Sequence, residues 1–175
     1  AGSRWKLFRK SFKIVFGQKY GLSALDFPLF EDGDITQFDS FLIRSGEDTS
    51  RSFLRDELLT NLALESSPEL MVQNSRYCVY YLNGEYQGIY NLKEAFSSGY
   101  FARRYDVDPE SVEVQRGYLT NDTEFMQLVR YASGHDLSRD EYYRYVEKQV
   151  NLESLIDWSI YEGYAANHDL AVNVR

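Results

Sequence analysis

The sequence has little cysteine and no long apolar run, and each absence excludes a class of protein. Its single cysteine, Cys78, can form no internal disulfide, so the fold does not depend on a disulfide framework. No apolar stretch approaches the roughly 20 residues that cross a bilayer, and no signal peptide is visible. We therefore expect no transmembrane segment.

Basic charge is also scarce. The formal net charge is −8 and the sequence pI is about 4.8, which argues against binding the phosphate backbone of a nucleic acid. The basic residues that do occur are concentrated before position 20, which leaves room for a local anion site. Their spacing alone favours the other interpretation, in which they cover the solvated face of a strand.

What the sequence does have is the composition of a globular domain. It contains 175 residues, of which 43% are hydrophobic and 26% charged, enough for one domain or most of one with a core of its own. Aromatic residues make up 16%, with fifteen tyrosines. Tyrosine suits a partly solvated sheet, because its ring is apolar and its tip is polar.

The first half of the chain has the patterns of strands with one inserted helix. Alternating apolar residues predict strands, and Asn83-Gly84 predicts a tight hairpin turn. Apolar residues at helical spacing predict the helix. A long loop is expected over 22–37 and a brief strand over 112–115. The predicted strands cover 11–16, 38–44, 75–82 and 87–92, and the helix covers 50–65.

The second half is predicted to be helical, over 97–105, 122–132, 139–150 and 152–166. Strands followed by helices are typical of an α+β fold. We expect a sheet-rich lobe over 1–95 and a helical lobe over 96–175. Such a pair of lobes suggests a cleft between them.

Glu57 is the most informative charged residue in the first half. On the predicted helix it lies within the arc bounded by Phe53 and Leu54, which points toward the core. A carboxylate in that position is partly desolvated and needs a cation or several donors to stay charged. The residues alone favour a simple structural salt bridge, with Arg44 or with a neighbouring helix.

Polar candidates for chemistry lie in both halves. A basic residue on a sheet, fixed by a glutamate on the adjacent helix, is a common way to hold a nucleotide phosphate. Arg44 and the early basic strand could supply the cation. After the last apolar helix, Asp169 and Asn173 are spaced to orient a hydroxyl and to hold a divalent cation.

Several segments, taken in order, resemble the CotH (spore coat protein H) kinase family. They cover most of the chain, and their ordered spacing is more specific than any one of them. The matching segments are Arg9 to Phe16, Gly21 to Phe30, Leu42 to Gly46, Arg55 to Leu58, Tyr81 to Glu94 and the family's Asn-x-Asp loop at Asn167 to Asp169.

The resemblance implies an atypical protein-kinase-like fold that uses ATP with Mg²⁺ or Mn²⁺ to phosphorylate Ser/Thr hydroxyls of a protein substrate. Asp169 would be the catalytic aspartate and Asn173 the metal-binding asparagine. Glu57 would be the helix glutamate that fixes a phosphate-positioning cation. That cation would be Lys13 or Arg44, with Lys13 slightly favoured.

The resemblance also places Glu94 where an adenine could bind, and it suggests export or a cell- or spore-surface location. The chain departs from the family pattern after Asp169, where Leu170 and Ala171 replace a Trp-Pro pair and one asparagine follows instead of two. The pattern also continues past Arg175, so we expect the domain to be cut at both ends and this fragment to be weakly active at best. A noncatalytic surface or coat-assembly module on the same fold is the alternative function.

Overall fold

A computed structural model of the chain describes residues 9–31, 35–46, 54–67, 70–115 and 123–166. The chain forms two compact units. Unit 1 comprises Ala1–Leu62 and Val72–Val114, and unit 2 comprises Ala63–Met71 and Gln115–Arg175. The predicted lobe boundary at residue 95 stays a prediction. The first helix after the sheet, Ser98–Tyr105, belongs to unit 1 together with the sheet.

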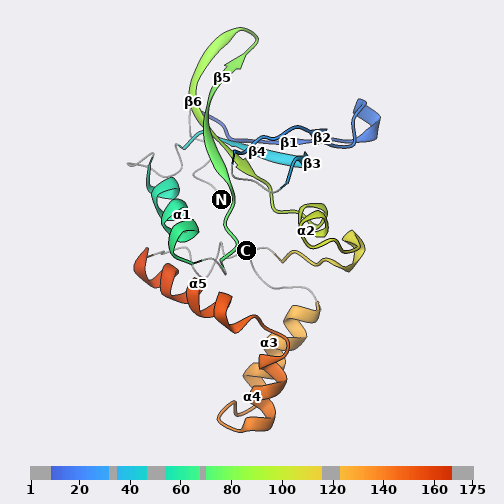
Figure 1. The fold of residues 1–175 in the computed structure, drawn as a ribbon, viewed down its shortest axis with the longest axis vertical. Helices are drawn as coiled ribbons and strands as arrows, with labels where there is room; N and C mark the ends of the chain where they lie inside the picture. Colours follow the sequence, from blue (N-terminus) through green and yellow to red (C-terminus); the bar gives the residue numbers. More distant parts are fainter. Residues whose placement is uncertain (1–8, 32–34, 47–53, 68–69, 116–122, 167–175) are drawn as a thin grey trace. The chain divides into compact units, whose positions relative to one another are not determined.

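Unit 1 is built on a four-stranded antiparallel sheet (Figure 1). Its spatial order is β1-β4-β6-β5, so the strand that closes the final hairpin, β6, lies inside the sheet. The alternating patterns predicted all four strands. Their bounds are β1 Phe12–Val15, β4 Ser40–Arg44, β5 Ser75–Leu82 and β6 Glu85–Glu94.

The predicted hairpin turn between β5 and β6 is confirmed. Asn83 and Gly84 both have positive φ, at 51° and 84°, as the tight turn requires. Only residues 91–94 of β6 pair with β4, so the outer part of the hairpin pairs with itself and extends past the other strands (Figure 1).

Gly88 allows the Arg9 side chain to lie close against this hairpin. Its φ is +108°, and a Cβ added there would lie 2.9 Å from the Arg9 guanidinium. The guanidinium stacks over the Tyr90 ring, 4.5 Å from its centroid, and donates to the Ile89 carbonyl. A residue without a side chain is therefore needed at this point of β6.

The core of unit 1 lies around the sheet and the long connection between β1 and β4. That connection was predicted to be a loop, but it also contains the two-residue strands β2 Leu25–Asp26 and β3 Gln37–Phe38, which pair with each other. It contributes four of the largest buried apolar side chains because it folds back over the sheet rather than lying in solvent. These are Leu29, Phe30, Ile35 and Phe38.

Three helical segments complete unit 1: α1 Arg55–Ser66, α2 Ser98–Tyr105 and the 3₁₀ turn η4 Pro109–Ser111, with a further 3₁₀ turn, η2 Gln18–Tyr20, after β1. Ser97 caps α2, since its hydroxyl accepts from the Tyr100 N–H. The same hydroxyl donates to Asp39, which ties the start of α2 to the sheet. The last residues of α1 belong to unit 2.

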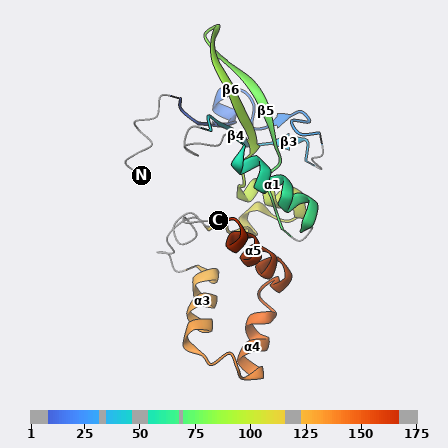
Figure 2. The same cartoon turned by 90° about the vertical axis from the view of Figure 1, so that its left-hand side faces the viewer.

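Unit 2 is helical and lacks a buried core within its three described helices. α3 Glu124–Gly134 and α4 Asp140–Glu147 lie side by side (Figure 2), and α5 Leu152–Tyr164 follows. Aromatic rings join the first two: Tyr131 of α3 stacks on His135 at the end of its own helix, with 4.0 Å between ring centroids, and lies 4.3 Å from the Tyr145 ring of α4. In α5, Ile156, Ile160 and Tyr164 are more than half exposed.

The structure corrects one expectation of local structure. Residues 112–115 form no strand, because the chain leaves η4 without pairing to the sheet. Cys78, on β5, is partly buried. Desolvation raises the pKa of its thiol, which leaves less of the reactive thiolate.

Within the described residues, one main sheet and five α-helices give the mixed architecture of helices and strands that was expected. The two-lobe, kinase-like arrangement stays a prediction. Within the described ranges, no helix has the length and apolar character needed to cross a membrane.

Candidate functional site

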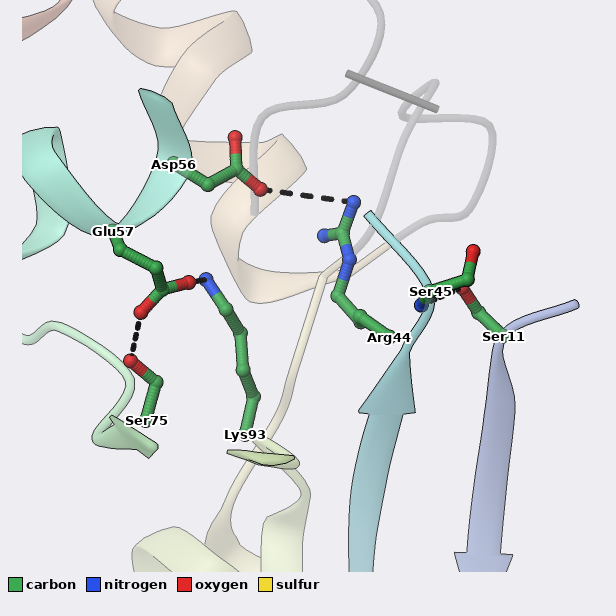
Figure 3. Close-up of polar contacts among 7 residues, drawn as sticks. All are labelled: Ser11, Arg44, Ser45, Asp56, Glu57, Ser75 and Lys93. Carbon is green, nitrogen blue, oxygen red and sulfur yellow. Dashed lines mark hydrogen bonds and ion pairs between the residues drawn. The ribbon is translucent and has the colours of Figure 1, made fainter. Parts of the chain in front are cut away.

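A polar cluster lies where α1 meets one face of the main sheet of unit 1. Its residues come from one helix and three strands, and they form two ion pairs side by side (Figure 3). The sequence places them together because Asp56 and Glu57 begin α1 directly after the connection from β4. One turn of helix therefore presents two adjacent carboxylates to the sheet.

The first ion pair joins Glu57 to Lys93 of β6, with 2.7 Å between Oε1 and Nζ. Both side chains are almost fully buried, at 10% and 6% exposure. The other carboxylate oxygen of Glu57 accepts a short hydrogen bond from the Ser75 hydroxyl on β5. Glu57 thus has the cation and the donor that its predicted desolvation required.

The second ion pair joins Asp56 to Arg44, the last residue of β4. Its Nη2 to Oδ2 distance is 3.7 Å, and the two side chains are 33% and 40% exposed. The Asp56–Arg44 pair has a longer distance and is more exposed to solvent than the Glu57–Lys93 pair. A partly exposed guanidinium at the edge of the cluster can contact an anion from solvent at lower cost than a buried ammonium can.

The end of β4 is itself fixed by a serine pair. The Ser45 N–H donates to the Ser11 hydroxyl at 3.1 Å, and the two hydroxyls lie 3.4 Å apart. Ser45 is 2% exposed. Because Ser45 follows Arg44 directly, this contact fixes the backbone from which the guanidinium extends (Figure 3).

The electrostatics of the cluster extend to Tyr77 on β5. Desolvation raises the pKa of its phenol, and the negative charge of Glu57 raises it further. The phenol therefore stays neutral over the whole physiological range. It adds a polar group to this face without adding charge.

Glu57 pairs with Lys93 and not with Lys13, the partner that the sequence slightly favoured, and the phosphate-positioning role of Lys13 stays a prediction. Lys13 is exposed on the edge strand β1, and its register partner on β4 is Leu42, which is in turn the partner of Lys93. Leu42 thus stands between the two lysines. Arg44, the second candidate, pairs with Asp56 instead of Glu57.

Glu94 lies on the opposite face of the sheet, because successive side chains of a strand alternate. It is 1% exposed, and its Oε2 accepts from the Tyr100 hydroxyl at 3.0 Å and from the Asn74 N–H at 2.9 Å. Its own backbone N–H and carbonyl are bonded to Asn74 and Gln73. This geometry supports a structural role, and the adenine-binding assignment of Glu94 stays a prediction without support here.

Asp169 and Asn173, the expected catalytic and metal residues, lie outside the described residues. Among the residues that are described, no group of three His, Cys, Asp or Glu side chains is placed to hold a metal ion. The described cluster is instead rich in cations held by carboxylates. That chemistry fits the phosphate end of a nucleotide.

Sequence reasoning identified Glu57 and Arg44 as members of the site but missed Lys93, Ser75 and Asp56. The signal for Lys93 is a lysine near the end of a strand whose preceding residues include the apolar Ile89, Tyr90 and Leu92. A lysine there needs a carboxylate partner, since the strand is central to the sheet.

Comparison with known proteins gives one match. Residues 2–175 match the protein family described as CotH kinase protein. No curated protein and no solved structure matches the chain significantly.

Proposed function

Since the chain belongs to the CotH kinase family, we propose that it transfers a phosphoryl group from ATP to a Ser or Thr hydroxyl of a protein. The observation that carries the proposal is the paired-cation cluster on α1 and the sheet. Phosphoryl transfer depends mainly on positioning and charge neutralisation, which such a cluster can provide.

We assign Arg44 as the cation that contacts the phosphates. In protein kinases, a basic residue on a strand pairs with an acidic residue on a helix in this way. Here β4 directly precedes α1, and Arg44 pairs with Asp56 across that connection. Its exposure leaves the guanidinium accessible to a ligand, and its planar fork suits two phosphate oxygens.

Lys93 and Glu57 have a different role in this proposal. Their buried pair, with the Ser75 hydroxyl, fixes the first turn of α1 against β5 and β6. Asp56 is carried on that same turn. The buried pair thus positions Asp56, and Asp56 in turn positions the Arg44 guanidinium.

The chemical step needs groups beyond the described cluster. The substrate hydroxyl oxygen forms a bond to the γ-phosphorus, the bond from that phosphorus to the β-γ bridging oxygen breaks, and ADP leaves. Asp169 accepts the hydroxyl proton, as the family resemblance implies. A divalent cation, Mg²⁺ or Mn²⁺, would neutralise the phosphates when bound, with Asn173 as its candidate ligand.

A phosphorylation assay on the full-length protein tests this function. Radiolabelled ATP with Mg²⁺ or Mn²⁺ should label a protein substrate or the kinase itself, and Asp169→Ala should abolish the label. Asp157→Ala, on α5, is the matched control and should retain it. Equal labelling by Asp169→Ala and wild type would overturn the catalytic assignment.

A binding module on the same fold is the second candidate, and the β5–β6 hairpin favours it. Its outer part exposes several large apolar side chains, and apolar patches, which soluble monomers rarely expose, often mark contacts with other proteins. A full-length protein that shows no thermal shift with ATP and metal, yet loses a partner after Tyr81→Ser and Tyr86→Ser, would favour this alternative. The exposed residues are Val79, Tyr81, Leu82, Tyr86 and Ile89.

A further inference from the structure

Asn91 lies in the centre of the sheet face that carries both ion pairs, although neither pair uses it. On β6 its register partners are Arg44 of β4 and Tyr77 of β5. Directly opposite residues of antiparallel strands project on the same face, and Lys93, two positions along β6, shares that face too. Asn91 is therefore a direct neighbour of the proposed phosphate-binding cation.

The side chain of Asn91 is buried but not satisfied. The residue is 6% exposed, and its Oδ1 is shielded from solvent with no hydrogen-bond partner among the described residues. Nearly all buried polar side-chain atoms in proteins are hydrogen-bonded, because an orphaned acceptor loses its bond to water without replacement. An unpaired acceptor beside a candidate ligand site indicates that a bound ligand provides the hydrogen-bond donor.

The chemistry of Oδ1 restricts what that partner can be. A carboxamide oxygen only accepts, so it cannot bond to the phosphate oxygens, which also only accept. A direct metal contact is disfavoured, because the carboxylates of the cluster, Asp56 and Glu57, are each already paired with a cation, and the described residues place no group of three His, Cys, Asp or Glu side chains to hold a metal ion. The remaining partners are donors carried by a nucleotide: a ribose hydroxyl, the exocyclic amine of the base, or a water bound to its divalent cation.

We propose that Asn91 is a nucleotide-positioning residue, whose Oδ1 accepts a hydrogen bond from a donor of the metal–nucleotide complex beside Arg44. This inference rests on the proposed function. It adds to that function a contact that distinguishes a nucleotide from a bare polyphosphate, because polyphosphate oxygens provide no donor at neutral pH.

The first experiment uses Asn91→Leu, which replaces the amide with an apolar group of similar size. If the oxygen is an orphan in the unliganded protein, urea unfolding should show Asn91→Leu to be as stable as wild type or more so. Gln87→Leu, the same type of change nearer the tip of β6, is the control and should leave nucleotide binding unchanged. A clear loss of stability in Asn91→Leu would show that the amide already has a structural partner, and would overturn the inference.

The second experiment measures binding of ATP with Mg²⁺ by calorimetry. Asn91→Leu should bind about 5-fold more weakly than wild type, the effect of one neutral hydrogen bond. Inorganic tripolyphosphate without Mg²⁺, which carries no donor, should bind both proteins equally. Asn91→Thr, which restores an acceptor oxygen, should recover part of the loss.

Analogues then identify the donor. Wild type should discriminate about 5-fold against one of 2′-deoxy-ATP, 3′-deoxy-ATP or inosine triphosphate, and Asn91→Leu should not discriminate against that analogue. If the donor is a metal-bound water, the difference between the two proteins should disappear when Mg²⁺ is omitted.

The possible failures are distinguishable. A wild-type protein that binds no ATP overturns the proposed function itself. A wild-type protein that binds ATP no better than Asn91→Leu leaves the proposed function standing and overturns the role of Asn91.

Discussion

Asp56 and Glu57 are adjacent in the sequence and both pair with a cation, yet their surroundings differ sharply. Glu57 and Lys93 are nearly excluded from water and lie 2.7 Å apart. Asp56 and Arg44 are about one-third exposed and lie 3.7 Å apart. The buried pair cannot lose one member without leaving an isolated charge, whereas the exposed pair can exchange its partner for water or a ligand.

This difference gives the two ion pairs separate roles, one in fixing α1 to the sheet and the other in binding a ligand. A pair that must remain intact is suited to fixing the helix, and a pair that can open at little cost is suited to receiving a phosphate. Substitutions in the Glu57–Lys93 pair should therefore mainly lower stability, and substitutions in the Asp56–Arg44 pair should mainly weaken ligand binding.

The largest effect on stability is expected from Lys93→Met. Removing the ammonium leaves Glu57 buried without a cation, which should lower the free energy of unfolding by about 3–5 kcal/mol. Urea denaturation measures the change. The double variant Lys93→Met with Glu57→Gln should recover much of the loss, because no charge is then stranded. A double variant as unstable as the single one would contradict this account.

A smaller loss is expected from Tyr100→Phe, on the opposite face of the sheet. Its hydroxyl donates to the buried Glu94, so its removal should cost about 1.5–3 kcal/mol at pH 7. The comparison with Lys93→Met shows whether a neutral donor supports a buried carboxylate less strongly than a cation does. An equal loss in the two variants would contradict that ranking.

The pH dependence of the same variant has a defined sign. Burial, and then the nearby Glu94 charge, raise the pKa of Tyr100 above its ordinary value of 10.0. The stabilisation from the neutral phenol is therefore present below about pH 10 and is lost as the pH rises toward the folded-state pKa. The difference in unfolding free energy between wild type and Tyr100→Phe should shrink above pH 10.

Arg44→Met should change stability by no more than about 1 kcal/mol, because its ion pair is partly exposed. Its binding of ATP with Mg²⁺ should nevertheless fall at least about 10-fold, the effect of losing one charge-assisted contact. Thermal denaturation and calorimetry on one preparation give both numbers. Lys13→Met is the matched control: it removes an exposed cation from the neighbouring strand and should alter neither.

The smallest effect is expected at Asp136, a fully exposed carboxylate between α3 and α4. Hydrogen bonds from Ser138 lower its pKa below the usual 3.8. Its contribution is therefore present at pH 4 and above and is lost as the pH falls through the lowered pKa. Any difference in stability between wild type and Asp136→Asn should disappear at lower pH. A difference that persists unchanged to pH 2 would contradict the assignment.

The sequence predicted local features well because they depend on nearby residues. Helical spacing predicted that Glu57 is desolvated, and the structure confirms its burial, although Leu54, which bounded the predicted inner arc, is 63% exposed. Alternation predicted the strands, and Asn83-Gly84 predicted the turn with the correct backbone signs. Each of these is a property of a few consecutive residues.

The partner of Glu57 could not be predicted in the same way. Lys13, Arg44 and Lys93 all project on one face, and only the register that places Leu42 between Lys13 and Lys93 determines which cation lies beside the helix. That register depends on packing between segments far apart in the sequence. The burial of Glu94 was missed for the same reason, since its partner Tyr100 lies on a helix that packs over the strand end.

The strand order β1-β4-β6-β5 has a kinetic consequence. The β5–β6 hairpin closes through a two-residue turn, so it can form early from local contacts. Pairing of β4 with β6 joins residues as distant as Phe41 and Glu94, and it must wait for a long loop to close. The salt bridge joins Glu57, within that loop, to Lys93 near its end, so we expect it to form late in folding as well. Loss of the Glu57–Lys93 salt bridge should therefore accelerate unfolding far more than it slows folding. This buried pair thus contributes mainly to the kinetic stability of the folded protein.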